Sequence, residues 1–256
     1  MTDSSIQVAG HQIRARRIGP DRPDKPVLVF LHDSLGCIET WRDFPAVVAE
    51  KTGLSALIYD RVGHGGSSSF TRARAKDYMH VEALEILPGV LEAHQIKQAI
   101  LIGHSDGGSI SLIAASELPQ VKGVITEGAH VFVEEVTLAG IREAVVAYGS
   151  TDIAKRLERY HGEKVPALYA AWTQTWTAPW FKDWNIEAIL PKITCPVLAI
   201  QGLDDEFGTP AQVSSIIGQV AGKALELLIP DCAHTPHKEA RALTEAAMVE
   251  FVASVV

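Results

Sequence analysis

The residue of this chain most suited to chemistry is Ser105, which lies in a Gly-x-Ser-x-Gly pattern. An apolar run, 98–102, precedes it as a buried strand would, and an apolar helical pattern follows at once. A turn that holds a serine in strained geometry needs small residues two positions before and after it, and Gly103 and Gly107 meet this need. The new helix would aim free N–H groups at a developing oxyanion. We predict that Ser105 is a catalytic nucleophile, with an ordinary glycine-rich turn as the alternative.

The carboxylate that such a serine needs follows another predicted strand. A serine hydroxyl is a weak nucleophile, so it needs an imidazole base, and the imidazole needs a carboxylate to fix its tautomer. The apolar run 196–201 predicts a buried strand, and the acids Asp204, Asp205 and Glu206 come just after it. Active sites of parallel sheets lie at the carboxyl ends of the strands. We predict that Asp205 orients the base, with Asp204 as the alternative.

The base is predicted in the loop after the apolar run 225–229. His234 lies where this loop can return to the sheet edge, whereas His237 follows Pro236 at the start of the last helix. We therefore predict that His234 is the base and keep His237 as the competitor. A His-x-x-His pair can also bind a metal, but no third and fourth ligands occur at a suitable spacing. We expect neither a metal nor a cofactor.

An oxyanion hole needs a second N–H group besides that of Asp106, the residue after the nucleophile. The loop after the predicted strand 26–32 is the natural donor. We predict that the backbone N–H of Ser34 supplies the second hydrogen bond, with Asp33 and Leu35 as alternatives.

The elements that must position these residues alternate along the chain. Short apolar runs bounded by turn residues predict strands, at 6–9, 13–18, 26–32, 55–59, 98–102, 121–125, 196–201 and 225–229. Helical patterns lie between them, at about 41–52, 78–94, 109–116, 210–220 and 238–255. We expect Pro88 to kink or split the second of these helices. The alternation predicts an α/β protein with a mostly parallel sheet covered on both faces.

The alternation fails between about 129 and 190, which predicts a helical cap inserted into the core. The core would then comprise residues 1–128 and 191–256. The cap segment holds four of the five tryptophans. Trp172 and Trp176 are predicted substrate contacts, although packing of the cap on the core is the alternative. His130, at the entrance of the cap, is a third predicted contact, with a structural hydrogen bond as its alternative.

Composition excludes several classes of partner. The 256 residues are 47% hydrophobic and carry a net charge of −8, which argues against nucleic acid or an anionic membrane as the main partner. Three cysteines suit a reducing compartment without disulfides. Neither a signal-peptide pattern nor an apolar run of about 20 residues occurs. We expect a cytoplasmic enzyme that binds a small molecule with an apolar part; homodimerisation stays open.

Together these segments resemble the α/β-hydrolase superfamily, and the resemblance covers essentially the whole chain. It is carried by the motifs at 32–36, 59–65, 103–108, 202–205 and 233–234. The chain looks most like small, capped bacterial members such as simple serine esterases and meta-cleavage-product hydrolases. The resemblance implies an α/β-hydrolase fold with a small helical cap and a Ser-Asp-His triad of Ser105, Asp205 and His234.

The chain departs from the pattern of these relatives at three places. Asp33 and Ala233 stand where glycine is usual, and the glycine- and proline-rich oxyanion loop of the meta-cleavage enzymes is absent. The last departure weakens a carbon–carbon hydrolase assignment. Arg61 and His64, in the loop after the strand 55–59, are expected to stabilise that loop.

We therefore expect a serine hydrolase that cleaves a small to medium carboxylic ester, lactone or thioester through an acyl-enzyme on Ser105. Carbon–carbon bond hydrolysis of a vinylogous diketone, with the same triad, is the first alternative. A low-turnover ligand receptor on a hydrolase fold is the second, and perhydrolase or cofactor-free oxygenase chemistry is the third.

Overall fold

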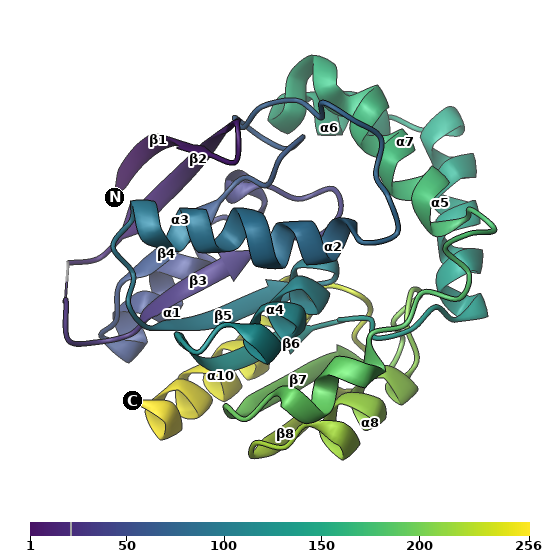
Figure 1. Ribbon diagram of the computed structural model, residues 1–256. Coiled ribbons are helices and arrows are strands. Elements are labelled where there is room, and N and C mark those ends of the chain that lie inside the picture. Colours follow the sequence, from purple (N-terminus) through teal and green to yellow (C-terminus); the bar gives the residue numbers. More distant parts are fainter. Residues whose placement is uncertain (21) are drawn as a thin grey trace.

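One sheet of eight strands forms the centre of the computed structural model, which describes residues 1–20 and 22–256 (Figure 1). The strands lie in the order β1-β2-β4-β3-β5-β6-β7-β8. Strands β1 and β2 pair antiparallel, β2 is antiparallel to β4, and β3 to β8 run parallel. Their bounds are β1 (Thr2–Val8), β2 (His11–Ile18), β3 (Val27–Leu31), β4 (Ala56–Tyr59), β5 (Ala99–His104), β6 (Val121–Glu127), β7 (Val197–Gly202) and β8 (Ala224–Ile229). The predicted mostly parallel sheet is confirmed.

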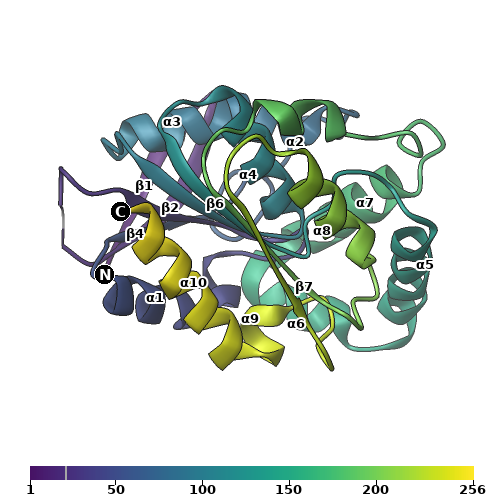
Figure 2. The ribbon, with the colours of Figure 1, turned by 90° about the horizontal axis from the view of Figure 1, so that it is seen from below.

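Helices cover both faces of this sheet (Figure 2). Their bounds are α1 (Phe44–Thr52), α2 (Tyr78–Val81), α3 (Leu87–Ala93), α4 (Asp106–Glu117), α5 (Glu135–Ser150), α6 (Ile153–His161), α7 (Val165–Trp176), α8 (Pro210–Gln219), α9 (Pro236–Glu239) and α10 (Arg241–Val255). A single turn of π-helix, Glu82–Ile86, joins α2 to α3. It lies just before Pro88, so the predicted interruption of this helix takes the form of a widened turn rather than a break.

The sheet separates two hydrophobic cores, and alternate residues of β3 enter each of them. Leu28 and Phe30 pack with side chains of α1 and α10 on one face. Val27, Val29 and Leu31 pack with side chains of α3, α4 and α8 on the other face. All five residues are buried, which explains why this strand is continuously apolar rather than alternating. The carboxyl end of β3 is therefore held from both sides.

The segment between β6 and β7 contains α5, α6 and α7 and lies beside the carboxyl ends of the strands (Figure 1). Trp172, Trp176 and Trp184 are buried in the core beneath these helices, whereas Trp180 is 47% exposed. Three of the four tryptophans of this segment are therefore packed inside the protein. Within the described residues, no helix is long and apolar enough to cross a membrane.

The turn from β5 into α4 brings three segments of backbone into close contact. Ser105 lies at this turn with φ 53° and ψ −119°, a backbone region that disfavours side chains. A Cβ atom on Gly103 would overlap the backbone oxygen of Gly107, and one on Gly107 would overlap the backbone oxygen of Leu31. The two glycines therefore allow β5, α4 and the end of β3 to approach closely enough to expose Ser105.

Replacing Gly107 with alanine is expected to lower the free energy of unfolding by about 3 kcal/mol or more, because backbone atoms that cannot rotate away must move. The measurement is urea denaturation followed by circular dichroism. Gly149→Ala is the matched control, since no atom lies within 4 Å of a Cβ placed there in α5. This control should be neutral or slightly stabilising. Equal stability of the two variants would contradict the packing described.

Candidate active site

A cavity of about 200 Å³ lies at the carboxyl ends of the strands, over the turn at Ser105. Of the eight residues predicted from the sequence to form the site, seven line it: Ser34, Ser105, Asp106, His130, Trp172, Trp176 and His234. The eighth, Asp205, lies behind the cavity wall against His234. The structure thus brings residues from four loops and from α7 to one place.

His234 and Asp205 form a carboxylate–imidazole pair. His234 Nδ1 lies 2.9 Å from Asp205 Oδ1 and 3.0 Å from Oδ2, so Nδ1 carries the hydrogen and Nε2 is left as a proton acceptor. The carboxylate is also held by the backbone N–H of Phe207 and the amide of Gln201. Asp204, the alternative acid, is exposed to solvent.

The electrostatics of this pair favour a charged carboxylate beside a basic imidazole. Burial opposes ionisation of Asp205, but the hydrogen bond and the charge of His234 lower the pKa of that carboxyl below its ordinary value. Burial also opposes protonation of His234, yet the hydrogen bond to Asp205 raises the pKa of the imidazole above 6.5. Gly128, with φ 56°, lies directly behind both side chains, and a Cβ there would touch the imidazole.

Ser105 faces the same cavity as His234 and is 8% exposed. Its backbone N–H donates to the carbonyl of Glu127, which ties the turn to the end of β6. Among the described residues, no hydrogen bond joins Ser105 Oγ to His234. Such a bond often tightens only when substrate is bound, so the arrangement is compatible with a nucleophile and its base.

Two backbone N–H groups are available beside Ser105. Asp106 is the first residue of α4, and its N–H points away from the helix, where it has no partner within the helix. Ser34 lies in the loop after β3. In the described part of the chain, neither N–H donates a hydrogen bond to protein. Both residues line the cavity, so these two groups can bind an oxyanion.

His237, the competing base, is engaged elsewhere. Its backbone N–H and its Nδ1 both lie 2.9 Å from Glu127 Oε2, and its ring packs 4.5 Å from that of Trp41. Burial opposes ionisation of Glu127, but the charge and hydrogen bonds of His237 lower the pKa of its carboxyl. The His237–Glu127 pair is buried and does not line the cavity.

His130 makes a structural hydrogen bond and also lines the cavity, and its contact with substrate stays a prediction. Its Nε2 lies 2.9 Å from the carbonyl of Phe207, and its ring packs 5.1 Å from that of Trp176 at the cavity wall. Sequence reasoning missed Phe207, whose ring lies 4.9 Å from that of His234. It also missed Thr137 and Ile141 of α5 as wall residues. Nothing in their spacing distinguishes them from ordinary core residues.

One group among the described residues has the spacing of a metal site: Cys37, Glu39 and Asp60. Glu39 forms an ion pair of 2.7 Å with Arg14, and Asp60 accepts two backbone N–H bonds. Burial raises the pKa of the Cys37 thiol to about 12, so it is protonated at neutral pH. Glu39 and Asp60 therefore already have partners within the protein, and the Cys37 thiol is not in the thiolate form that binds metals.

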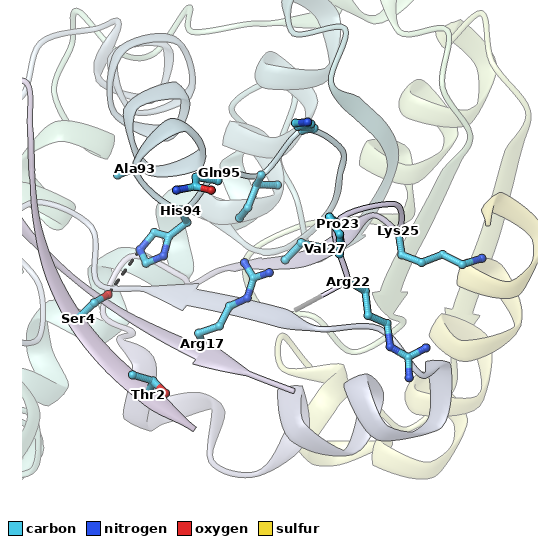
Figure 3. A pocket seen from close by; sticks show the side chains of 12 residues that line it. Thr2, Ser4, Arg17, Arg22, Pro23, Lys25, Val27, Ala93, His94 and Gln95 are labelled. Carbon is cyan, nitrogen blue, oxygen red and sulfur yellow. Dashed lines mark hydrogen bonds between the residues drawn. The ribbon is translucent and has the colours of Figure 1, made fainter. Parts of the chain in front are cut away.

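A larger cleft, of about 540 Å³, lies at the amino ends of the strands (Figure 3). Its described lining is basic and includes Arg22, Lys25 and Lys97. A serine–histidine contact occurs there, between Ser4 Oγ and His94 Nε2 at 3.5 Å. Among the described lining residues, none has a carboxylate side chain that could orient the imidazole.

Curated proteins of known name are similar to this chain over different lengths. Serine hydrolase BPHL of Mus musculus is 25% identical over 254 residues, which cover 93% of this chain and 81% of the relative. A 2-succinyl-6-hydroxy-2,4-cyclohexadiene-1-carboxylate synthase of Salmonella paratyphi C is 33% identical over 112 residues, or 43% of this chain and 41% of the relative. The names of these two relatives describe different activities.

Solved structures and a family profile extend the likeness to the whole fold. The enol-lactonase from Burkholderia xenovorans LB400 superposes with a TM-score of 0.78 at 18% identity, covering 98% of this chain and 100% of that one. At this identity the likeness shows the fold, and the expected α/β-hydrolase fold is confirmed. The profile of the alpha/beta hydrolase family matches residues 28–247. The chain therefore belongs to the α/β-hydrolase family.

Proposed function

We propose that this α/β hydrolase is a serine hydrolase that cleaves a small to medium carboxylic ester, lactone or thioester. The observation that carries the proposal is the Asp205–His234 pair at the wall of the cavity that Ser105 faces. A nucleophile, an oriented base and two free N–H groups are the parts that acyl transfer to water requires.

The reaction would proceed in two halves. His234 Nε2 takes the proton of the Ser105 hydroxyl as its oxygen attacks the substrate carbonyl. The N–H groups of Ser34 and Asp106 stabilise the oxyanion, and His234 then protonates the leaving oxygen or sulfur as its bond to the acyl carbon breaks. In the second half, His234 deprotonates a water that attacks the acyl-enzyme, and the acid leaves as Ser105 regains its proton.

The cavity wall supports a compact substrate without a negative charge. Trp172, Trp176 and Phe207 supply apolar surface, which suits the apolar part of an ester. The carboxylates of Asp33 and Glu206 belong to lining residues, whereas the described lining contains neither lysine nor arginine. We propose that the helices between β6 and β7 act as a cap that closes this wall over the substrate.

Replacing Ser105 with alanine is expected to lower kcat for p-nitrophenyl butyrate by at least about 10³-fold, because the nucleophile is lost. The melting temperature should stay close to that of the parent, since the change removes one hydroxyl. Ser116→Ala, in α4 and outside the cavity lining, is the control and should retain activity. Turnover by Ser105→Ala like that of the parent protein would refute the scheme.

The pH dependence of kcat/KM should show an acid limb from His234. The imidazole must be neutral to act as a base, and its pKa is raised above 6.5, so kcat/KM should fall as the pH drops through a value above 6.5. Asp205→Asn should move the limb to lower pH and reduce kcat by about 10³- to 10⁴-fold. The exposed Asp204→Asn is the matched control. An identical profile for the two variants would contradict the assigned pair.

A substrate pair tests the charge of the cavity. p-Nitrophenyl succinate and p-nitrophenyl butyrate both have a four-carbon acyl group, but the succinate ester has a terminal carboxylate where the butyrate ester has a methyl group. We expect kcat/KM for the butyrate ester to be higher by at least about tenfold, because like charges repel in a site of reduced dielectric. Glu206→Gln should reduce the ratio of kcat/KM for the butyrate ester to kcat/KM for the succinate ester. A preference for the succinate ester would instead favour a substrate bearing a carboxylate.

A further inference from the structure

Arg61 is a buried charge that the proposed reaction does not use. Its side chain is the largest fully buried one in the described part of the chain. Its Nε and Nη1 have no hydrogen-bond partner among the described residues. Burial opposes its charge, but Asp106 and Glu82 nearby raise the pKa of the guanidinium. A buried cation with unsatisfied donors is costly, so its contacts need an explanation.

The guanidinium contacts both segments that carry the N–H groups of the oxyanion hole. Arg61 Nη2 donates to the carbonyl of Asp33 at 2.9 Å. The same nitrogen lies 3.6 Å from Asp106 Oδ2, and the Asp106 side chain is 1% exposed. Arg61 therefore bridges the loop after β3 and the first residue of α4.

The backbone of Arg61 strengthens the same contact through His32. The Arg61 N–H donates to His32 Nε2 at 3.0 Å, so the ring hydrogen of the neutral imidazole lies on Nδ1. His32 Nδ1 lies 2.8 Å from the carbonyl of Asp33 and donates to it. Burial keeps this imidazole neutral by lowering its pKa well below 6.5. The Arg61 guanidinium and the imidazole oriented by the Arg61 N–H thus both donate to the Asp33 carbonyl, which also accepts the Gly36 N–H at 3.2 Å.

The direction of this carbonyl determines the direction of the Ser34 N–H. The Asp33 carbonyl and the Ser34 N–H belong to one planar trans peptide group, so they point in opposite directions. With the carbonyl directed toward Arg61, the N–H is directed away from it. The next two carbonyls of the loop, those of Ser34 and Leu35, are likewise faced by buried imidazoles, His64 Nε2 at 3.1 Å and His161 Nε2 at 2.9 Å.

We propose that Arg61 is a positioning residue for the oxyanion hole. It directs the Ser34 N–H into the cavity through the Asp33 carbonyl, and it holds the start of α4 through Asp106. The inference rests on the proposed function, because it assigns a task to the oxyanion N–H groups of that scheme. Fixed donors of this kind stabilise a transition state because they need no reorganisation when charge develops.

Arg74 offers a matched control for this role. Its Nη1 lies 3.8 Å from the same Asp106 Oδ2, and its side chain is 5% exposed. It packs over the ring of Tyr78 and, among the described hydrogen bonds, donates none to the loop after β3. Arg61→Met and Arg74→Met each remove one buried cation beside Asp106, but only the first removes a donor to the Asp33 carbonyl. Arg61→Lys keeps the charge and loses the planar fork.

The experiment compares two inhibitors of the same shape. An alkyl trifluoromethyl ketone forms a tetrahedral oxyanion adduct with the serine, whereas the corresponding secondary alcohol binds without reacting. We expect Arg61→Met to weaken binding of the ketone by about 10- to 100-fold and binding of the alcohol by less than about threefold. Arg61→Lys should show an intermediate loss, and Arg74→Met should leave the ketone-to-alcohol ratio within about threefold of the parent. For an ester substrate, kcat should fall with little change in KM.

An unchanged ketone-to-alcohol ratio in Arg61→Met would overturn the proposal. Equal losses in Arg61→Met and Arg74→Met would also overturn it, because Arg61 would then only balance the charge of Asp106. If Arg61→Met does not fold, Arg61→Lys and His32→Phe provide the test. Each of these variants must weaken binding of the ketone more than binding of the alcohol. Failure of the proposed function looks different, since the parent protein would then bind the ketone no better than the alcohol and Ser105→Ala would change neither.

Discussion

The close approach of β5, α4 and the end of β3 at the turn around Ser105 is the constraint on which the site depends. Gly103 and Gly107 make this approach sterically feasible, and the positive φ of Ser105 follows from it. One geometric feature therefore exposes a hydroxyl, begins a helix with an unpaired N–H and brings the loop after β3 alongside. The packing of the two hydrophobic cores on opposite faces of the sheet offsets the backbone strain at Ser105.

Two carboxylate–imidazole pairs lie near this turn and show how surroundings assign different tasks to one interaction. Asp205–His234 and Glu127–His237 both bond through Nδ1 of the histidine. His234 lines the cavity, so its other nitrogen can exchange a proton with a substrate. His237 packs against Trp41 inside the protein, where its partner fixes the start of α9. The first pair is suited to catalysis and the second to structure.

Much of this arrangement follows from local sequence patterns, and the remainder depends on contacts distant along the chain. Alternating apolar runs predicted the parallel sheet, and the order of its strands placed Asp205 and His234 at the same edge as Ser105. The sequence favoured Asp205 and left Asp204 as the alternative, and the fold shows that Asp205 contacts His234 whereas Asp204 is exposed. Arg61 was expected to stabilise its own loop, because its bond to the Asp33 carbonyl, 28 residues away, has no local signature.

The central claim, that Ser105 is the nucleophile beside two oxyanion donors, is tested most directly by a covalent phosphonate adduct. The protein would be inactivated with a p-nitrophenyl alkylphosphonate, mapped by peptide mass spectrometry and crystallised. The account predicts one adduct, on Ser105, with the phosphoryl oxygen within hydrogen-bond distance of the N–H groups of Ser34 and Asp106. Loss of activity with Ser105 unmodified, or an adduct whose oxygen points away from both groups, would contradict it.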